Sequence, residues 1–158
     1  MSQGPATKDA RKIICQNRRA LHEYFVTDRF EAGLVLTGSE VKSLRAGKAN
    51  LGDAHAEVRD EELFLVNCHI SPYSHATHFN HEPLRARKLL MHKQEIRRLA
   101  TRVLERGFTL IPLSLYFLKG KAKVELGLAK GKKHHDKREA VRERDERRDL
   151  AVEMARRR

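Results

Sequence analysis

Two arms of alternating apolar residues near the C-terminus constrain the fold of this 158-residue chain more than any other feature. In the first arm the alternating residues are Leu113, Leu115 and Phe117, and in the second every other residue from 122 to 128 is apolar. Alternation with a period of two is typical of a strand that buries one face. The Lys-Gly-Lys sequence between the arms is expected to form the turn of a hairpin.

Earlier segments predict further strands and one short helix. "YFVTDRFEAGLVL" at 24–36 places two short apolar runs around a charged turn, which favours two strands. "AHAEVRDEELFLVNCHI" at 54–70 predicts two more strands, joined by an acidic turn. Thr37 and Glu40 have the spacing of a capping box, so we expect a helix to begin there and to end at Gly47.

A second helix is expected at the spacing of Ile96, Leu99, Val103 and Leu104, ending at Gly107. The segment before it, "SPYSHATHFNHEPLR", is expected to be a turn-rich loop. These elements sum to a mainly β fold of about six strands with two or three helices. A small antiparallel sheet must hide its edges, and a closed barrel of the oligonucleotide-binding (OB) type does so. A half-open sheet covered by the helices is the alternative.

Apolar patterning stops at Leu128, and "GKKHHDKREAVRERDERR" at 131–148 has only Ala140 and Val141 as apolar residues. Such a segment cannot bury a hydrophobic face, so we expect it to be disordered when free. Residues 1–12 are polar and are also expected to be disordered. The predicted organisation is therefore a folded domain at 13–130 between a disordered N-terminus and a basic tail at 131–158.

The chain has 33 Lys and Arg against 21 Asp and Glu, a formal net charge of +12. A polyanion is the expected partner, with nucleic acid ahead of an anionic membrane, although basic charge also keeps many small proteins soluble. The N-terminus has no secretory signal and no apolar run approaches the length of a membrane span. Two cysteines without CxxC spacing suit a reducing compartment. We therefore expect a cytoplasmic protein with no membrane partner.

Enzyme motifs are not found in the sequence. It holds no phosphate-binding loop, dinucleotide fingerprint or nucleophile elbow, so we expect a protein that is not an enzyme and needs no cofactor. His75, His78 and His81 have a three-residue spacing that leaves a zinc-dependent hydrolase open as an alternative. A polar loop without metal is the preferred interpretation, because this spacing in a loop fixes no ligand geometry.

Basic residues fall into four sets along the predicted domain, and phosphates would supply most of the affinity of a surface that joined them. Several aromatic residues at strand positions could stack on bases, but aromatic residues in strands are more often part of the core. The four sets are Arg18, Arg19 and His22; Lys42, Arg45 and Lys48; Arg85, Arg87 and Lys88; and Lys119, Lys121 and Lys123.

Six blocks of the sequence resemble the small protein B family, the bacterial transfer-messenger-RNA-binding (SsrA-binding) proteins. They are "RRALHEYFV", "FEAGLVLTGSEVKSLRAGKANL", "NCHISPY", "NHEPLRARKLLMHKQEI", "GFTLIPLSLYF" and "KVELGLAKGKKHHDKRE". The resemblance implies an OB-type barrel and a role in trans-translation. In that role the protein binds the tRNA-like domain of transfer-messenger RNA. Elongation factor Tu with GTP, an indirect partner, then helps to deliver the RNA to ribosomes stalled on messages without a stop codon.

The resemblance also implies which residues contact RNA, and two sites are expected in a monomeric protein. For transfer-messenger RNA, the residues implied by motif or by membership of a basic set are Asn17, Arg18, Arg19, His22, Glu31, Lys42, Ser43, Arg45, Lys48, Asn50, Arg87, Lys88 and Lys123. For the decoding centre and the empty message channel of the ribosome, they are Gly131, Lys132, Lys133, His135, Asp136, Lys137, Arg138, Arg142, Arg144, Arg147 and Arg148.

Glu31 is unusual on a phosphate-binding surface, where a carboxylate accepts hydrogen bonds from base or ribose donors or holds an arginine. In the tail, Glu139/Arg142, Glu143/Arg147 and Asp145/Arg148 have helical spacing, so we expect a helix when the tail is bound. The competing hypothesis is a generic single-strand nucleic-acid-binding barrel whose tail adds only charge.

Overall fold

The computed structural model describes residues 11–76, 79–105, 107–132 and 134–156, and for 134–141 it describes the backbone only. The elements, in chain order, are β1 (Arg11–Gln16), α1 (Ala20–Glu23), β2 (Tyr24–Leu34), α2 (Gly38–Arg45), β3 (Ala49–Asn50), β4 (His55–Arg59), β5 (Glu62–Val66), β6 (His69–Ile70), β7 (Arg87–Leu90), α3 (Lys93–Leu104), β8 (Phe108–Leu118), β9 (Lys121–Gly131) and α4 (His134–Arg156).

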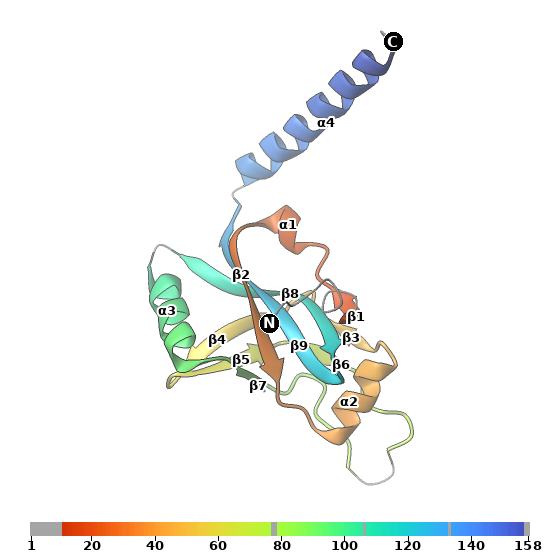
Figure 1. The fold of residues 1–158 in the computed structure, drawn as a ribbon, viewed down its shortest axis with the longest axis vertical. Coiled ribbons are helices and arrows are strands. Elements are labelled where there is room, and N and C mark those ends of the chain that lie inside the picture. The colour runs from red at the N-terminus through yellow and green to blue at the C-terminus, as the bar shows by residue number, and fades with distance from the viewer. Residues whose placement is uncertain (1–10, 77–78, 106, 133, 157–158) are drawn as a thin grey trace, which may run out of the picture.

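Within the described residues, six of these strands form a ring of antiparallel pairs (Figure 1). From β8 the pairing passes through β4, β5, β7 and β2 to β9, and β9 pairs again with β8. β1 adds to the same edge of β8 as β4, and β3 with β6 forms a separate two-stranded sheet. The mainly β class is therefore confirmed, and the ring leaves few strand edges for unwanted pairing.

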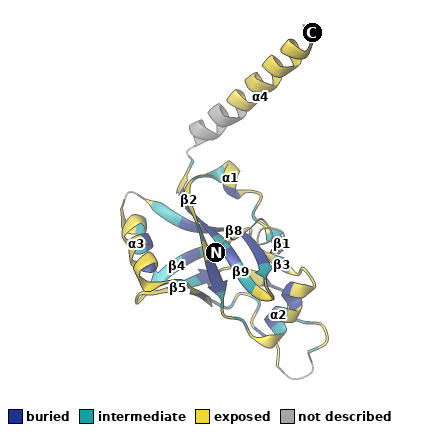
Figure 2. Ribbon diagram, viewed as in Figure 1, coloured by how far each residue is buried: buried dark blue, intermediate teal, exposed yellow. Residues whose placement is uncertain are grey.

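The core lies inside this ring (Figure 2). Its fully buried leucines include Leu63 and Leu65 from β5, Leu115 from β8 and Leu126 from β9. α3 covers one opening of the ring with Ile96 and Leu99, as the helical spacing predicts. Leu104 does not join that face and is 88% exposed, because α3 ends there and the chain turns away toward Gly107.

The predicted hairpin is β8 and β9, and its turn places Lys119 and Gly120 at positive φ (52° and 77°). The first arm does not alternate as expected, because β8 is buried continuously through Tyr116. A register shift between Pro112 and Ser114 reverses the faces, so Leu113 packs in a second small cluster while Leu115 enters the main core. A bulge inserts one residue and thereby changes which face the later side chains occupy.

The expectation of two strands in 24–36 is wrong, because β2 is one strand of 11 residues. It pairs with β9 from Tyr24 to Gly33, and the polar residues form a bulge between Val26 and Asp28 rather than a turn. The Thr27 hydroxyl donates to the Leu128 carbonyl across this bulge (3.1 Å), which satisfies a polar group inside the ladder.

Two other predictions at the level of local structure are confirmed. The Thr37 backbone N–H donates to Glu40 Oε1 (2.8 Å) at the start of α2, and Gly47 has φ +73° after the end of the helix. The β4–β5 turn places Asp60 and Glu61 at positive φ, as an acidic two-residue turn requires.

Both ends of the predicted domain differ from the expected boundaries. The composition of residues 1–12 predicts disorder, but Arg11 and Lys12 begin β1, which pairs with β8. At the other end β9 continues through Gly131, which pairs with Tyr24. The tail then forms α4, a helix that projects away from the ring (Figure 1). Within the described residues, no helix has the length and apolar character needed to cross a bilayer.

Candidate nucleic-acid interface

The corner between β1 and α1 carries the first predicted set. Asn17 is tied to β8, because its backbone N–H donates to the Leu113 carbonyl (2.8 Å) and its side-chain amide donates to the Pro112 carbonyl (3.1 Å). This anchor leaves Arg18 and Arg19 exposed on the following turn, and His22 is exposed on α1. None of the ion pairs between described residues uses Arg18 or Arg19.

The second set lies on and after α2. Lys42 and Arg45 are exposed, and the Lys42 ammonium lies 5.4 Å from the centre of the Tyr73 ring. Lys48 is exposed beyond the helix. The Asn50 side chain accepts a hydrogen bond from the Gly52 N–H (2.7 Å), so it shapes the turn after β3 while it remains exposed.

Ser43 differs from its neighbours on α2. Its side chain is buried and its hydroxyl donates to the Ser71 carbonyl (2.7 Å). The prediction that Ser43 contacts RNA therefore conflicts with the fold, since its hydroxyl is already used to hold the loop after β6 against the helix. A helix of this length presents neighbouring residues to different faces, and Ser43 lies on the face opposite solvent.

Two hollows are lined in part by β1, one together with residues of α2 and the other together with residues of the α1 corner. The larger, of about 660 Å³, has Lys12, Arg45 and Lys119 around an apolar lining. The smaller, of about 330 Å³, is lined by residues that include Asn17, Arg18, Arg11 and Arg29. Ile13, which is half exposed, lines both. Arg18 of the first predicted set and Arg45 of the second thus line two hollows that share β1.

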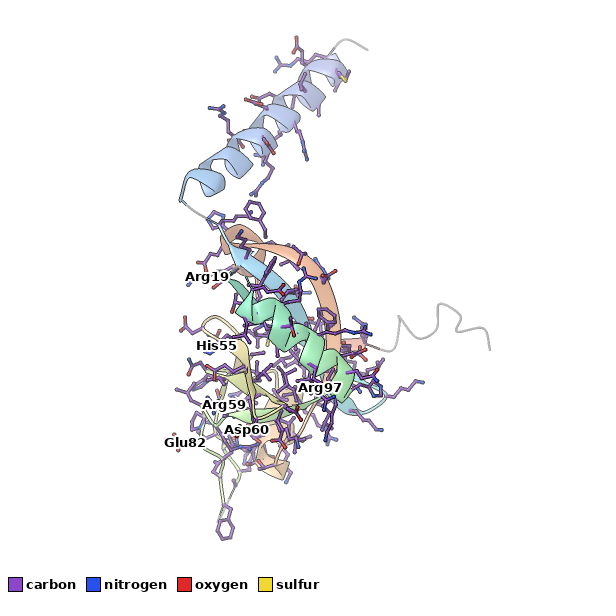
Figure 3. All side chains as sticks on the ribbon, turned by 90° about the vertical axis from the view of Figure 1, so that its left-hand side faces the viewer. Arg19, His55, Arg59, Asp60, Glu82 and Arg97 are labelled. Atoms are coloured by element: carbon purple, nitrogen blue, oxygen red, sulfur yellow. The ribbon has the colours of Figure 1, made fainter. Side chains whose placement is uncertain are left out.

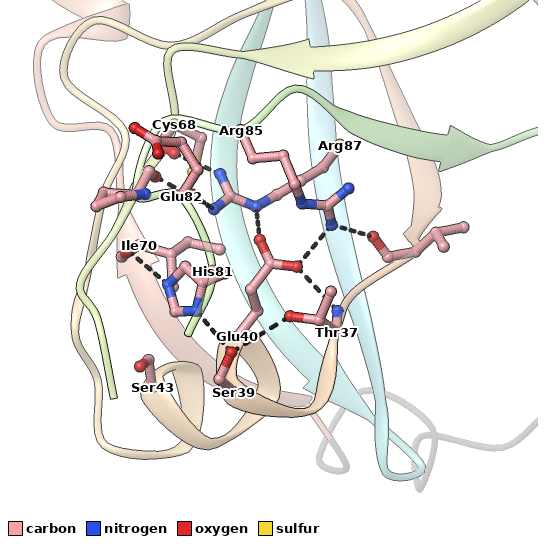
Figure 4. A network of polar contacts seen from close by, with 12 residues as sticks. Thr37, Ser39, Glu40, Ser43, Cys68, Ile70, His81, Glu82, Arg85 and Arg87 are labelled. Carbon is pink, nitrogen blue, oxygen red and sulfur yellow. Dashed lines mark hydrogen bonds and ion pairs between the residues drawn. The ribbon is translucent and has the colours of Figure 1, made fainter. Parts of the chain in front are cut away.

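The third predicted set does not form a free cationic surface (Figure 4). Arg87 is fully buried and its guanidinium bonds to Glu40 Oε2 and to the Cys68 carbonyl (2.6 Å). Arg85 donates to Glu40 Oε1 (2.6 Å). Arg87 is therefore a structural residue, and its predicted RNA contact is corrected. Lys88 points outward from β7 and donates to Glu62 (3.2 Å), so it remains exposed but paired.

Burial by itself raises the pKa of Glu40, but hydrogen bonds from Arg85, from the Thr37 N–H and from Arg87 outweigh it and lower that pKa to about 2. The carboxylate is thus ionised in the folded protein at neutral pH. It joins the start of α2 to β7, and this junction fixes the helix that carries Lys42 and Arg45.

The three histidines of the loop do not share one environment. His81 is buried, with its two ring nitrogens bonded to the Ser39 hydroxyl (2.9 Å) and the Ile70 carbonyl (2.8 Å). His75 packs edge-on against Tyr73, and His78 lies outside the described residues. The part of the chain that the structure describes holds no group of three or more potential metal-binding side chains.

Glu31 lies on β2 in a cluster that joins four strands. Its Oε2 accepts hydrogen bonds from the Tyr116 hydroxyl and from Arg11 (3.3 Å). The Arg11 guanidinium also lies 4.5 Å from the centre of the Tyr116 ring and 3.6 Å from Glu125. Lys123, on β9, is half-buried and pairs across the strands with Gly33.

The start of the tail is tied to α1. The Lys132 N–H donates to the Glu23 carbonyl (2.8 Å) and its ammonium donates to the Leu21 carbonyl (3.0 Å). The same ammonium lies 4.7 Å from the centre of the Phe25 ring. Lys132, which the sequence assigned to ribosome contact, therefore holds the point at which the chain leaves the ring.

The other tail residues lie along α4 or just before it. Gly131 is exposed at the end of β9, and Lys133 lies outside the described residues. His135, Asp136, Lys137 and Arg138 have helical backbone. The four predicted arginines further along α4 are all exposed: Arg142, Arg144, Arg147 and Arg148. One helical ion pair in this stretch joins Arg142 to Glu146 (3.8 Å), a pair that the predicted spacings did not include.

Sequence reasoning missed Arg11, Lys12, Arg29 and Tyr116, which line the hollows or orient Glu31. The run "KIIC" contains two β-branched residues and was the available sign of a first strand.

The α3 side of the molecule, seen in Figure 3, presents labelled residues from outside the predicted sets, including His55, Arg59 and Arg97. Arg59 and Arg97 are paired with Glu57 (2.8 Å) and Glu61 (3.5 Å).

The family model described as SmpB protein matches residues 14–156, nearly the whole chain. Among curated proteins, an SsrA-binding protein of Symbiobacterium thermophilum is 60% identical over 139 residues, which cover 87% of this chain and 88% of the relative. An SsrA-binding protein of Syntrophobacter fumaroxidans is 57% identical over 146 residues, which cover 92% and 91%.

A similar fold is also found among solved structures. A chain in the structure described as "tmRNA-SmpB: a journey to the center of the bacterial ribosome" is 49% identical, with a TM-score of 0.66. The likeness covers 81% of this chain and 94% of that one.

Proposed function

The chain belongs to the SmpB family, and from this premise we propose that it binds transfer-messenger RNA and acts with it in trans-translation on the ribosome. The observation that carries the proposal is the likeness, at 49% identity, to a chain in a structure described as transfer-messenger RNA with SmpB in the bacterial ribosome. The family is one of RNA-binding proteins, so the chain works by binding rather than by catalysis. Its site of action is the bacterial cytoplasm.

The ring of strands serves as an OB-type barrel for the tRNA-like domain of transfer-messenger RNA. The surface that supports this role runs from the α1 corner along β1 to α2. Its cations are Arg18, Arg19, Lys42, Arg45 and Lys48, which are exposed and can therefore approach phosphates. Lys12 and Lys119 add to it at the larger hollow.

The tail serves the ribosome. α4 projects away from the ring and its arginines are exposed, so an RNA-lined channel could surround it. Like-charge repulsion along the helix falls when phosphates neutralise Lys and Arg, which favours the helix in the bound state over a disordered free state. The segment 131–138 engages the decoding centre and the arginines beyond it occupy the empty message channel. The protein acts as a monomer, and elongation factor Tu with GTP takes part indirectly.

Deletion of the tail tests whether RNA binding and action on the ribosome belong to separate parts of the chain. A chain truncated after Gly131 is expected to keep its affinity for transfer-messenger RNA within about threefold and to lose tagging of proteins on stalled ribosomes. Replacing Asp136, Lys137 and Arg138 together by Ala should act in the same way. Loss of RNA binding on truncation would contradict the two-part function, and normal tagging by the triple variant would contradict the role of these residues.

The alternative is a generic single-strand-binding barrel with a nonspecific basic tail. The basic charge of the chain favours this alternative over other classes of function, because cations alone are enough to contact the phosphate backbone of any single-stranded nucleic acid. Scrambling residues 134–156 at constant composition separates the two functions. The generic alternative predicts normal activity, whereas trans-translation predicts loss of tagging with transfer-messenger RNA binding retained.

A further inference from the structure

The core-facing side of the sheet continues past the end of the helix that covers it. Leu110 and Leu128 are buried partners in the β8–β9 ladder and belong to the main core. Phe108 and Lys130 are also partners in that ladder, and each is two residues from one of these leucines, so they lie on the same face. α3 ends at Leu104, which is 88% exposed. The face therefore runs from the core out into solvent.

Phe25 extends this face onto a third strand. It is the partner of Lys130 in the β2–β9 ladder, as Phe108 is in the β8–β9 ladder. Directly opposed residues point to the same side of a sheet, so Lys130 stands between the two phenylalanines. Neighbouring strands are about 4.8 Å apart, which places the two phenylalanine Cα atoms about 10 Å from each other. Phe25 is 46% exposed and Phe108 is half-buried, so both rings have accessible surface.

Each of the two rings also lies against a cation. The Lys132 ammonium is 4.7 Å from the centre of the Phe25 ring, and the Arg102 guanidinium, from α3, is 5.3 Å from the centre of the Phe108 ring. Cations and rings therefore alternate in the order Arg102, Phe108, Lys130, Phe25 and Lys132, a set that we name the cation–aromatic row. The row passes from α3 across three strands to the end of β9, which leads to the base of α4 (Figure 1).

The cations of the row are not neutralised by carboxylates. None of the ion pairs between described residues includes a cation of the row. Another arginine that lies over a ring has a different environment, because Arg59 is 5.9 Å from the centre of the Phe64 ring but pairs with Glu57 at 2.8 Å. The row thus presents three positive charges beside two rings, and a concentration of one sign of charge attracts a ligand of the opposite sign.

This combination fits an unpaired nucleotide better than a duplex or a protein. Aromatic side chains stack on the faces of unpaired bases, and cations beside them bind the phosphates. A duplex keeps the faces of its bases within its own stack, so it offers nothing to the rings. A protein partner that covered the two rings would also desolvate the cations between and beside them, which costs free energy unless each cation is paired.

We propose that the cation–aromatic row stacks unpaired bases of small-subunit ribosomal RNA on Phe25 and Phe108, with Lys130 and Arg102 at the phosphates. The inference rests on the proposed function, which places the start of the tail at the decoding centre, and the row adjoins that start at Lys132. The row then holds the ring of strands against the small subunit beside the tail, while the cations of the α1 corner and of α2 serve transfer-messenger RNA.

Zero-length cross-linking with ultraviolet light tests the stacking and identifies the RNA. The full chain is irradiated in complex with transfer-messenger RNA and a ribosome stalled on a truncated message, and the peptide–nucleotide adducts are identified by mass spectrometry. We expect adducts between Phe25 or Phe108 and unpaired nucleotides of small-subunit RNA. Adducts of these rings with transfer-messenger RNA alone would overturn the ribosomal assignment. Adducts elsewhere in the chain, with none at either ring, would overturn the stacking.

Affinity measurements with isolated small subunits test the energetic contribution of the row. Phe25→Leu keeps an apolar side chain but removes the aromatic face, so it is expected to weaken binding to small subunits about tenfold. The same variant should bind the tRNA-like domain of transfer-messenger RNA with unchanged affinity. Lys130→Gln, at an exposed position of the same face, should weaken subunit binding about threefold and reduce its dependence on salt, because one phosphate contact is lost.

Phe64→Leu is the matched control, because Phe64 is a strand phenylalanine that also lies under an arginine, but that arginine is ion-paired. It should leave the affinity for small subunits unchanged. Equal subunit affinities of Phe25→Leu and the unaltered protein would overturn the row, as would an equal loss in Phe64→Leu. An unaltered protein that binds neither the tRNA-like domain nor small subunits would overturn the proposed function, and with it the ligand inferred for the row.

Discussion

Glu40 and Arg87 form an ion pair in which neither side chain is exposed to solvent. Glu40 lies in the first turn of α2 and Arg87 begins β7, so the pair joins the helix that carries Lys42 and Arg45 to the ring of strands. Arg85 shares the same carboxylate, and the Cys68 carbonyl accepts from Arg87. The position of the exposed cations on α2 therefore depends on a buried charge.

Arg87→Met should destabilise the protein by about 3 kcal/mol, because breaking a buried pair leaves an uncompensated charge. Urea unfolding measures this change. Lys88→Met, on the exposed face of the same strand, is the matched control and should change the free energy of unfolding by less than about 0.5 kcal/mol. Equal effects of the two substitutions would show that Arg87 does not stabilise the fold through burial.

Lowering the pH should decrease the free energy of unfolding, because Glu40 becomes protonated. The pKa of Glu40 is about 2 in the fold and its ordinary value is 4.5. A lowered folded pKa contributes stability above the ordinary value, and this contribution is lost as the pH falls from 4.5 toward 2. Glu40→Gln should be less stable at neutral pH yet lose less on acidification, which urea titrations at several pH values would detect. Parallel pH dependences would contradict this assignment.

Neither cysteine should react in the native state near neutral pH. Burial raises the pKa of Cys68 to about 12 and that of Cys15 to about 11, and the thiolate is the reactive form. Alkylation with iodoacetamide, followed by mass spectrometry, should therefore be slow in buffer and rapid for both thiols in urea. Fast native labelling at Cys15 would show that β1 opens without global unfolding.

Lys119→Asn should stabilise the hairpin by about 0.5 kcal/mol, since Asn tolerates positive φ better than Lys and Asn-Gly suits this type of turn. Gly120→Ala should cost about 1 kcal/mol at φ +77°. Thermal unfolding measures both. If the two substitutions gave the same sign, the turn geometry would not control stability.

The amides of residues 142–156 should exchange rapidly with solvent in the free protein and slowly on the ribosome. Ion pairs such as that between Arg142 and Glu146 add only about 0.5 kcal/mol each to a helix. Hydrogen exchange with mass spectrometry measures the change, and β9 provides a protected internal reference. Strong protection in the free protein would contradict coupled folding.

Local signals predicted several elements correctly, because they depend on a few neighbouring residues. The Thr37–Glu40 capping box, the Gly47 stop and the Lys119–Gly120 turn all lie where the sequence places them. β2 was divided in error because the partner strand, rather than the polar residues themselves, decides whether a chain turns.

Local signals also predicted the candidate site only in part. A cluster of basic residues in the sequence indicates positive charge but does not show which of the side chains face inward. The structure buries Arg87 and Leu89 on the inner face of β7, but the adjacent Leu89 and Leu90 in the sequence do not show which face of the strand is inner. No local pattern could reveal that Tyr116 reaches Glu31, because 85 residues separate them in the chain.

Lys132 gives the tail a fixed origin. Lys132 directly follows β9, and its hydrogen bonds to the Glu23 and Leu21 carbonyls hold the chain against α1 at this point. A helix of 23 residues that starts from a held point extends about 35 Å. In the function that we propose, this length sets how far from the ring of strands the tail reaches into the message channel. Glycines inserted after Lys132 would lengthen the connection between the ring of strands and α4 and make the distance between them variable.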